Sequence, residues 1–288
     1  MAAKIIDGVA LGNRIRADIA DAVAKLRNDG HPVQLNAILV GSSPAGELYA
    51  RRQGEACRAV GIGYELVTLP AEATAEQVSG EIARLNADRA VTGIMLHQPL
   101  PPQLEATALQ YQIAPVKDVE GVNPANLGYL LCGQTRIAPC TAGAVMEMIR
   151  STGINLRGAE AVVVGASEIA GKPIVMLLSE ERATVTLCRS ATADLAGHTR
   201  RADVLVAAVG KVGLISGEMV RPGACVIDVG INRVRGADGT MRTVGDVDYA
   251  SVLDVAGYVS PVPGGVGPVT VAMLLKNTLR GAMLALGK

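Results

Sequence analysis

Short apolar segments alternate with helical patterns along this chain, and this alternation constrains the fold most. Three strand-length apolar runs lie at residues 34–40, 64–69 and 91–96. Apolar side chains recur at helical spacing in residues 11–27, 44–60 and 74–85. Strands that alternate with helices are typical of a parallel sheet covered on both faces, so the sequence predicts an α/β fold.

A second series of strands follows residue 140. Thr141 can cap a helix, and four further strands are expected at residues 160–164, 183–187, 203–207 and 225–228. A length of 288 residues suits two domains. The last helix, expected at residues 268–286, is predicted to return to the first domain. We therefore expect an α/β catalytic domain at 1–140 plus 269–288, and a Rossmann-type NAD(P)-binding domain at 141–268.

Composition excludes several classes of partner. The 27 basic and 27 acidic residues balance, so nothing favours nucleic acid or an anionic membrane surface. No apolar run approaches the length of a membrane span. The five cysteines form no C-x-x-C pair, which favours buried thiols in a reducing compartment over disulfides or a metal site. We expect a cytoplasmic protein without a bound metal.

A glycine-containing turn lies between an expected strand and an expected helix. It reads Gly165-Ala166-Ser167-Glu-Ile169-Ala-Gly171. Glycine backbone at a helix N-terminus can hold a pyrophosphate, which predicts a dinucleotide site. The spacing departs from G-x-G-x-x-G, so an ordinary tight turn is the alternative.

The end of the next strand indicates which dinucleotide binds. An NAD site usually offers an acidic residue there to the ribose hydroxyls. This strand ends at Cys188-Arg189-Ser190, with one cation and no acid. Arg189 and Ser190 suit a 2′-phosphate, so we expect NADP, with NAD as the alternative; both side chains could instead be solvated surface groups.

Polar and aromatic residues of the first domain are candidates for chemistry. Tyr49 and Gln53 are four residues apart, so they share one helical face. His97 follows a strand at the edge where ligands bind in open α/β sheets, and it could serve as an acid or base. Lys117-Asp-Val-Glu120-Gly121 places two acids on a loop. Each of these has a plain structural alternative: a half-buried tyrosine, a boundary histidine and solvated charge.

The segment Pro261-Val-Pro263-Gly264-Gly265-Val266-Gly267-Pro268 precedes the last helix. Its prolines stiffen the backbone, and its glycines allow angles that other residues avoid. A rigid loop with little side-chain bulk at a helix N-terminus can approach a ligand closely. A simple tight turn is the alternative.

Taken together, these stretches resemble the bifunctional methylenetetrahydrofolate dehydrogenase/cyclohydrolase family. The matching segments are 40–44 with Tyr49, 56–61, 117–121, 139–141, 164–173, 226–232, 245–247 and 261–278. The resemblance implies oxidation of 5,10-methylenetetrahydrofolate to the methenyl form with NADP, then hydrolysis to 10-formyltetrahydrofolate. It also implies a homodimer with a folate cleft between two domains.

The resemblance assigns roles by position. Tyr49, Gln53, His97 and Glu120 occupy catalytic positions. Folate-binding positions are Tyr49, Leu96, His97, Gln98, Glu120, Pro263, Gly264, Gly265, Val266 and Gly267. Cofactor-binding positions are Gly165, Ala166, Ser167, Ile169, Arg189, Ser190 and Ile231.

Departures from the family pattern concentrate at these positions. Gln53 replaces the lysine of Tyr-x-x-x-Lys, His97 replaces a glutamine, and Glu120 replaces an aspartate. Ala166 replaces a familiar arginine beside the cofactor glycine. An amide cannot supply a titrating proton near neutrality, so we expect the dehydrogenase step to persist and the cyclohydrolase step to be weak or lost.

Three alternatives stay open. His97 could replace the lysine, because an imidazole titrates near neutrality, and the chain would then be fully bifunctional. The chain could also be a folate- or nucleotide-binding paralogue without turnover, since the longer Glu120 side chain would displace the substrate. The altered site could instead accept a modified folate or another one-carbon carrier.

Overall fold

The computed structural model describes residues 2–41, 43–236 and 239–288 and divides into two compact units. The three-stranded unit comprises Arg14–Cys140 and Leu274–Lys288, and the six-stranded unit comprises Met1–Asn13 and Thr141–Met273. Helices α1 (Gly8–Asn28) and α10 (Val266–Ala285) each contribute residues to both units. Each unit is described by itself below.

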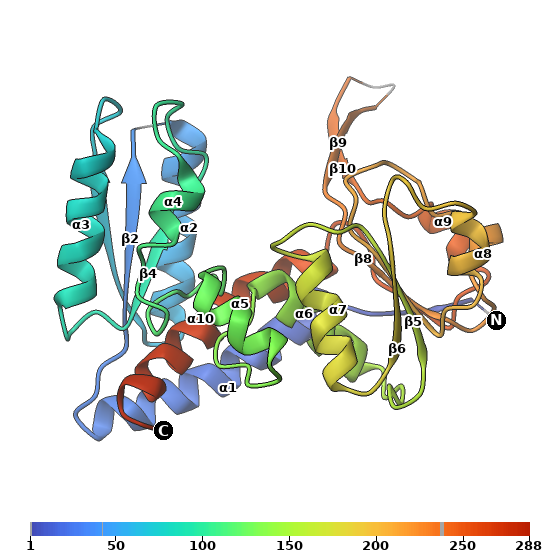
Figure 1. The fold of residues 1–288 in the computed structure, drawn as a ribbon, viewed down its shortest axis with the longest axis horizontal. Coiled ribbons are helices and arrows are strands. Elements are labelled where there is room, and N and C mark those ends of the chain that lie inside the picture. The colour runs from blue at the N-terminus through green and yellow to red at the C-terminus, as the bar shows by residue number, and fades with distance from the viewer. Residues whose placement is uncertain (1, 42, 237–238) are drawn as a thin grey trace. The chain divides into compact units, whose positions relative to one another are not determined.

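The three-stranded unit is built on a parallel sheet with strand order β3-β2-β4. These strands are β2 (Gln34–Val40), β3 (Gly63–Leu69) and β4 (Gly93–Leu96). Its helices are α2 (Pro44–Ala59), α3 (Ala75–Ala87), α4 (Ala106–Gln110) and α5 (Pro124–Leu131). In Figure 1, β2 lies between α3 on one side and α2 with α4 on the other. The predicted parallel sheet with helices on both faces is confirmed.

Local sequence explains where α3 begins. The Thr74 side chain accepts a hydrogen bond from the Gln77 backbone N–H, and the Gln77 side chain accepts one from the Thr74 N–H. This reciprocal capping box satisfies two backbone donors that a helix N-terminus leaves unpaired. Val78, Ile82 and Leu85 then face the sheet at helical spacing and are buried.

The six-stranded unit carries a parallel sheet of order β1-β11-β8-β7-β5-β6. The strands are β1 (Lys4–Ile5), β5 (Glu160–Val164), β6 (Thr184–Cys188), β7 (Val204–Ala207), β8 (Cys225–Asp228) and β11 (Tyr258–Val259). Its helical segments are α6 (Cys140–Ser151), α7 (Gly171–Glu180), α8 (Leu195–Thr199), α9 (Tyr249–Leu253) and the 3₁₀ turn η1 (Gly217–Met219). This is the expected Rossmann-type arrangement.

Residues 1–13 group with the six-stranded unit because β1 pairs with β11, Lys4 opposite Tyr258 and Ile5 opposite Val259. The domain division expected from sequence, 1–140 plus 269–288 against 141–268, stays a prediction. The C-terminal part of α10 does group with the three-stranded unit, as expected. There the Asn277 amide donates hydrogen bonds of 2.9 Å to the carbonyls of Val119 and Ala138.

An antiparallel hairpin leaves the six-stranded unit after β8. It consists of β9 (Asn232–Arg235) and β10 (Met241–Val244), with Asn232 opposite Val244. Figure 1 shows it extending away from the body of its own unit. The sequence prediction did not include this hairpin.

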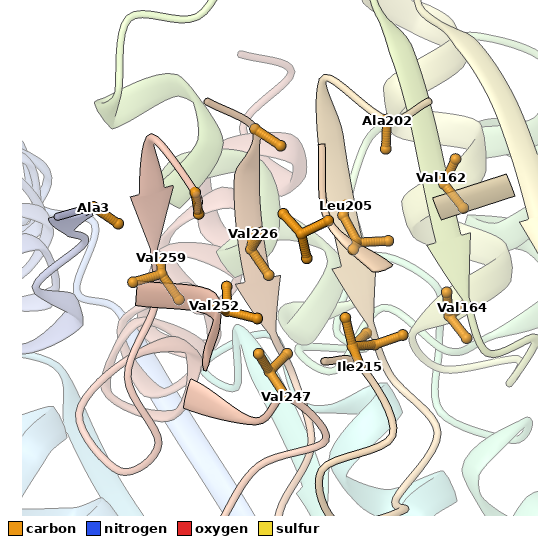
Figure 2. Packing of buried hydrophobic residues seen from close by; sticks show 14 of the residues in the cluster. Ala3, Val162, Val164, Ala202, Leu205, Ile215, Val226, Val247, Val252 and Val259 are labelled. Carbon is orange, nitrogen blue, oxygen red and sulfur yellow. The ribbon is translucent and has the colours of Figure 1, made fainter. Parts of the chain in front are cut away.

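The core of the six-stranded unit is made largely of valine, alanine, isoleucine and leucine, since the sequence has no Phe or Trp. Figure 2 shows Leu205, Val226 and Val259, from three neighbouring strands, with side chains in one buried cluster. Small branched side chains on adjacent parallel strands pack closely without aromatic rings. The rigid sheet fixes the loops at its strand ends.

Candidate active site

A cavity of about 500 Å³ opens at the carboxyl ends of three adjacent strands of the six-stranded unit. Its walls are residues 164–167 after β5, residues 189, 190 and 192 after β6, and residues 208, 209 and 211 after β7, with Leu195 and Leu214. This edge of a doubly wound sheet is where nucleotides bind. The predicted cofactor residues Gly165, Ala166, Ser167, Arg189 and Ser190 are therefore brought together.

The turn after β5 needs glycine at both ends. Gly165 has a φ of +117°, and a Cβ there would collide with the carbonyl of Ala208. A Cβ on Gly171 would collide with the carbonyl of Gly165. Ser167 Oγ accepts a hydrogen bond of 3.3 Å from the Gly171 N–H at the start of α7. The departure from G-x-G-x-x-G still yields a tight strand-to-helix turn whose backbone a phosphate could approach.

Positive charge lines the cavity after β6 and β7. Arg189 is exposed, and its side chain has no ion-pair partner among the described residues. Its backbone N–H donates to Thr192 Oγ1 at 2.8 Å, which fixes the bend that carries the side chain. Lys211 forms part of the opposite wall. The glycine turn and these two cations fit a phosphorylated dinucleotide.

Two predicted cofactor residues lie outside this lining. Ile169 is 62% exposed on the turn before α7, and Ile231 is 72% exposed just after β8. Exposed apolar side chains at this sheet edge could cover a bound nucleotide. Their roles stay predictions.

In the three-stranded unit, Tyr49 and His97 lie next to each other as an aromatic pair. Their ring centroids are 6.0 Å apart and the rings are nearly perpendicular. Tyr49 is 58% exposed on α2, whereas His97 is buried at the end of β4. The sequence therefore located two side chains that the fold brings together.

Burial determines the charge of His97. It lowers the pKa of the imidazole below its usual value. Nε2 of His97 lies 3.5 Å from the hydroxyl of Tyr64 on β3, whose own pKa is raised to about 12 by burial. The imidazole is therefore neutral at neutral pH and faces a hydroxyl that keeps its proton.

Gln53 lies one turn after Tyr49 and is buried. Its Oε1 atom has no hydrogen-bond partner in the part of the chain that the structure describes. A buried acceptor without a partner costs about 1–3 kcal/mol, and such groups often serve a ligand. Gln53 thus offers an acceptor to an N–H donor.

Two charged side chains of the Lys117–Gly121 loop, Lys117 and Asp118, form structural hydrogen bonds. The Lys117 ammonium donates to the carbonyls of Leu85, Asn86 and Asp88 at the end of α3, so it closes that helix. Asp118 accepts hydrogen bonds from the Gly121 and Asn123 N–H groups and from the Asn126 amide. The alternative of plain solvated charge fails for both residues, which shape the loop.

Glu120, on the same loop, has an unusual pKa for a glutamate. Burial, together with the nearby Asp118 carboxylate, raises its pKa to about 7 from an ordinary 4.5. Its Oε2 accepts a hydrogen bond of 3.1 Å from the Gln110 amide on α4. The charge of Glu120 contributes to raising the pKa of Tyr49, after burial. Glu120 therefore changes protonation state near neutrality.

Several supporting residues were absent from the sequence prediction. The hydroxyl of Tyr64 lies next to His97, and the Gln110 amide donates to Glu120. The Asn277 amide donates to the Val119 carbonyl. Only Asn277 lay within a segment that carried the resemblance. The other two lie on β3 and α4 without a local motif, so spatial proximity alone identifies them.

The remaining predicted folate residues differ in accessibility. Leu96 is fully buried in the hydrophobic cluster of its sheet, while Gln98 is exposed just after it. Residues 263–267 belong to the six-stranded unit. There the Gly8 N–H donates to the Gly264 carbonyl at 2.9 Å, so the loop is in close contact with the start of α1. Their contacts with folate stay predictions.

The structure offers no group of three or more His, Cys, Asp or Glu side chains arranged for a metal within residues 2–41, 43–236 and 239–288. Over the same residues, none of the helices combines the length and apolar character needed to span a membrane.

A cavity for a phosphorylated dinucleotide and a separate cluster of polar residues on a second α/β unit define a class of NAD(P)-binding enzyme. The family model for the tetrahydrofolate dehydrogenase/cyclohydrolase catalytic domain matches residues 6–120. The model for the NAD(P)-binding domain of that family matches residues 139–285. The chain belongs to the tetrahydrofolate dehydrogenase/cyclohydrolase family.

Relatives match along most of their length. A protein of Bordetella petrii named bifunctional protein FolD is 50% identical over 280 residues, covering 97% of this chain and 94% of the relative. A relative of the same name from Rhodobacter capsulatus is 49% identical over 277 residues, covering 96% of this chain and 92% of the relative. The predicted family and enzyme class are confirmed.

Solved structures agree with this assignment. The methylenetetrahydrofolate dehydrogenase-cyclohydrolase of Trypanosoma brucei, complexed with NADP and an inhibitor, has a TM-score of 0.91 and 40% identity, covering 100% of both chains. The bifunctional FolD enzyme of Campylobacter jejuni also has a TM-score of 0.91, at 38% identity, covering 98% of this chain and 99% of that one.

Proposed function

We propose that this chain oxidises 5,10-methylenetetrahydrofolate to the methenyl form with NADP and also hydrolyses the methenyl form to 10-formyltetrahydrofolate. The observation that carries the second half is Glu120, whose pKa of about 7 gives the site a group that can exchange protons near neutrality. The relatives of about 50% identity carry the word bifunctional in their names, which supports both activities.

The expected weakness or loss of the cyclohydrolase step finds no support. That expectation assumed that replacing the usual lysine by Gln53 leaves the site without a titrating group. Glu120 contradicts this assumption, because its pKa lies near 7, unlike the pKa of a solvated glutamate. We therefore favour the fully bifunctional alternative, with Glu120 rather than His97 handling the proton.

His97 is the weaker candidate for that role. Burial lowers the pKa of its imidazole, so it holds no extra proton to donate at neutral pH. Its Nε2 atom already faces the Tyr64 hydroxyl. We assign His97 to packing and polar contact beside Tyr49.

NADP is favoured over NAD by the charge at the cofactor cavity. Arg189 and Lys211 line it, and none of its described lining residues is a carboxylate. A 2′-phosphate would gain charge-assisted hydrogen bonds from Arg189, while a bare ribose would lack the acidic partner that it usually receives. The relative solved with NADP supports this choice. Ala166 supplies no charge, so Arg189 is the residue expected to distinguish NADP from NAD.

Bound NADP supplies the hydride acceptor for the first step. Residues of the three-stranded unit would contact the substrate. Gln53 offers its unpartnered Oε1 to a substrate N–H, and Tyr49 offers an exposed ring and hydroxyl. Residues 263–267 stay candidate folate-binding residues on family resemblance.

Hydrolysis needs one proton to be removed and one to be delivered. The Glu120 carboxylate takes a proton from the water whose oxygen bonds to the methenyl carbon. The bond from that carbon to N5 then breaks, and N5 takes the electron pair and the proton held by Glu120. The remaining hydroxyl loses its proton to solvent as the formyl C=O forms.

Glu120→Gln and Glu120→Asp test this proposal. We expect Glu120→Gln to slow hydrolysis of added methenyltetrahydrofolate about 10²-fold or more, with a smaller loss of NADP reduction. Glu120→Asp keeps a titrating carboxylate and should lose less hydrolysis than the amide. Glu81→Gln, which removes a half-buried carboxylate paired with Arg84, is the control. Hydrolysis at the native rate in Glu120→Gln would contradict the role of Glu120.

A homodimer in the cytoplasm is also proposed, on family resemblance. Gel filtration with light scattering would test the dimer. NADP reduction on addition of methylenetetrahydrofolate tests the first step directly.

A further inference from the structure

Asp246 lies just behind one wall of the cofactor cavity. It follows β10 and is completely buried. It is not among the residues that line the cavity. Its carboxylate nevertheless contacts the wall formed by the residues after β7, which connects it to cofactor binding.

Three successive backbone N–H groups converge on this carboxylate. Val209 and Gly210 donate to Oδ2 at 2.6 and 2.9 Å, and Lys211 donates to Oδ1 at 2.8 Å. The Asn232 amide, at the start of β9, adds a bond of 3.0 Å to Oδ1. Successive N–H groups that point inward form a small anion-binding concavity, and here an internal carboxylate occupies it.

A second carboxylate holds Asp246 itself in place. Asp228, at the end of β8, accepts a hydrogen bond of 2.9 Å from the Asp246 N–H and one of 3.0 Å from the Val247 N–H. A Cβ on Gly245 would collide with the Asp228 carboxylate, so the backbone must approach it closely. The position of Asp246 is therefore fixed by the end of a core strand.

The turn that Asp246 holds has little other support. Residues 209–213 are exposed, and Gly210 has a φ of +75°, with open space where a Cβ would lie. Without the carboxylate, this turn would lose three charge-assisted hydrogen bonds and gain conformational freedom. Binding a cofactor against a mobile wall would then require ordering that wall.

We propose that Asp246 is a positioning residue for the cofactor, which it serves by holding the Val209–Lys211 turn as a preformed wall of the cavity. The cofactor never needs to touch Asp246. Because the turn is ordered before binding, the free energy of NADP binding is not reduced by the cost of ordering this segment. The role concerns cofactor affinity and is independent of the hydrolysis step.

A matched pair of glycine substitutions tests this inference without removing the buried charge. Gly210→Ala strains the turn at positive φ and keeps its N–H, and Gly210 does not line the cavity. Gly223→Ala imposes the same kind of strain at φ +84°, also in open space, at the opposite end of the sheet. Affinity for NADP is measured by titration calorimetry on the full-length chain.

We expect Gly210→Ala to raise the Kd for NADP about 5-fold or more, and Gly223→Ala to change it less than about 2-fold. Asp246→Asn, if it folds, should raise the Kd more than Gly210→Ala does. Hydrogen exchange in the native protein should show protected amides at 209–211 before NADP is added. Equal Kd values for the two glycine variants, or unprotected amides at 209–211, would overturn the proposal.

Discussion

The hydroxyl of Tyr64 lies 3.5 Å from Nε2 of His97, and both side chains come from strands of the three-stranded sheet. The contact joins an imidazole whose pKa burial lowers to a phenol whose pKa burial raises to about 12. Neither group changes charge near neutrality. The relationship makes this pair a polar contact within the site rather than a proton relay.

His97→Gln is therefore expected to keep the shape of the pH profile for hydrolysis. The amide can still accept from or donate to Tyr64 while lacking a titrating proton. We expect the rate to fall by less than about 10-fold at every pH. Initial rates of methenyltetrahydrofolate loss across the neutral range, corrected for the uncatalysed reaction, measure this. Loss of the pH-dependent limb in this variant would instead identify His97 as the proton carrier.

Glu120→Gln should stabilise the protein relative to the native chain in alkaline solution and have little effect on its stability in acidic solution. The folded pKa of Glu120 is raised from 4.5 to about 7, so its contribution to stability is lost as pH rises through that range. Above pH 7 the ionised group is disfavoured by about 3 kcal/mol at most, and the amide removes this penalty.

Urea unfolding of the native protein and of the Glu120→Gln variant, at about pH 5 and about pH 9, measures this difference in stability. The gain in unfolding free energy should be present at the higher pH and small at the lower one. A gain in unfolding free energy of equal size at both pH values would show that the folded protein does not disfavour the ionised form of Glu120.

Gln53→Met should stabilise the ligand-free protein and weaken folate binding. The substitution removes a buried acceptor that has no partner among the described residues, at similar side-chain volume. We expect a gain of about 1 kcal/mol in unfolding free energy and a rise in KM for methylenetetrahydrofolate. Gln34→Met is the control, because the Gln34 amide already donates to Asn36 Oδ1 at 3.2 Å. Destabilisation by both substitutions would mean that Gln53 is satisfied in solution.

Arg189→Ala should change the choice of cofactor. Loss of charge-assisted hydrogen bonds to the 2′-phosphate raises the KM for NADP about 10- to 100-fold, with much less effect on the KM for NAD. Arg157→Ala, at the other end of the same sheet, is the control. Parallel initial rates with both cofactors measure the change. An equal rise for NAD and NADP would contradict recognition of the phosphate.

Sequence periodicity predicted most strands of the two parallel sheets because buried strands form continuous apolar runs, whereas the two-residue strands β1 and β11 were not predicted. Residues 160–164 and 225–228 are strands as predicted, since their side chains are buried on both faces. The β9–β10 hairpin was not predicted because neither strand has an apolar run: β9 alternates exposed arginines with half-buried side chains, and β10 begins with two exposed residues. The final helix begins at Val266, two residues before Pro268, because proline is tolerated anywhere in the first turn.

The site was only partly predictable for a physical reason. Local motifs located Tyr49, His97 and the Gly165 turn, which lie at the ends of strands or early in helices. The ionisation of Glu120 depends on burial beside Asp118 and on Gln110 from α4, and no local pattern encodes that environment. For this reason the sequence suggested that loss of the usual lysine weakens the cyclohydrolase step, whereas the structure gives Glu120 a pKa near 7.

We propose that one chain carries out both steps. The direct test mixes the full-length protein with methylenetetrahydrofolate and NADP, and follows NADPH, the methenyl form and 10-formyltetrahydrofolate together. We predict that NADPH and 10-formyltetrahydrofolate form in parallel, with little methenyl form accumulating. If NADPH forms together with an equal amount of methenyl form that decays only at the uncatalysed rate, the chain does not catalyse the second step.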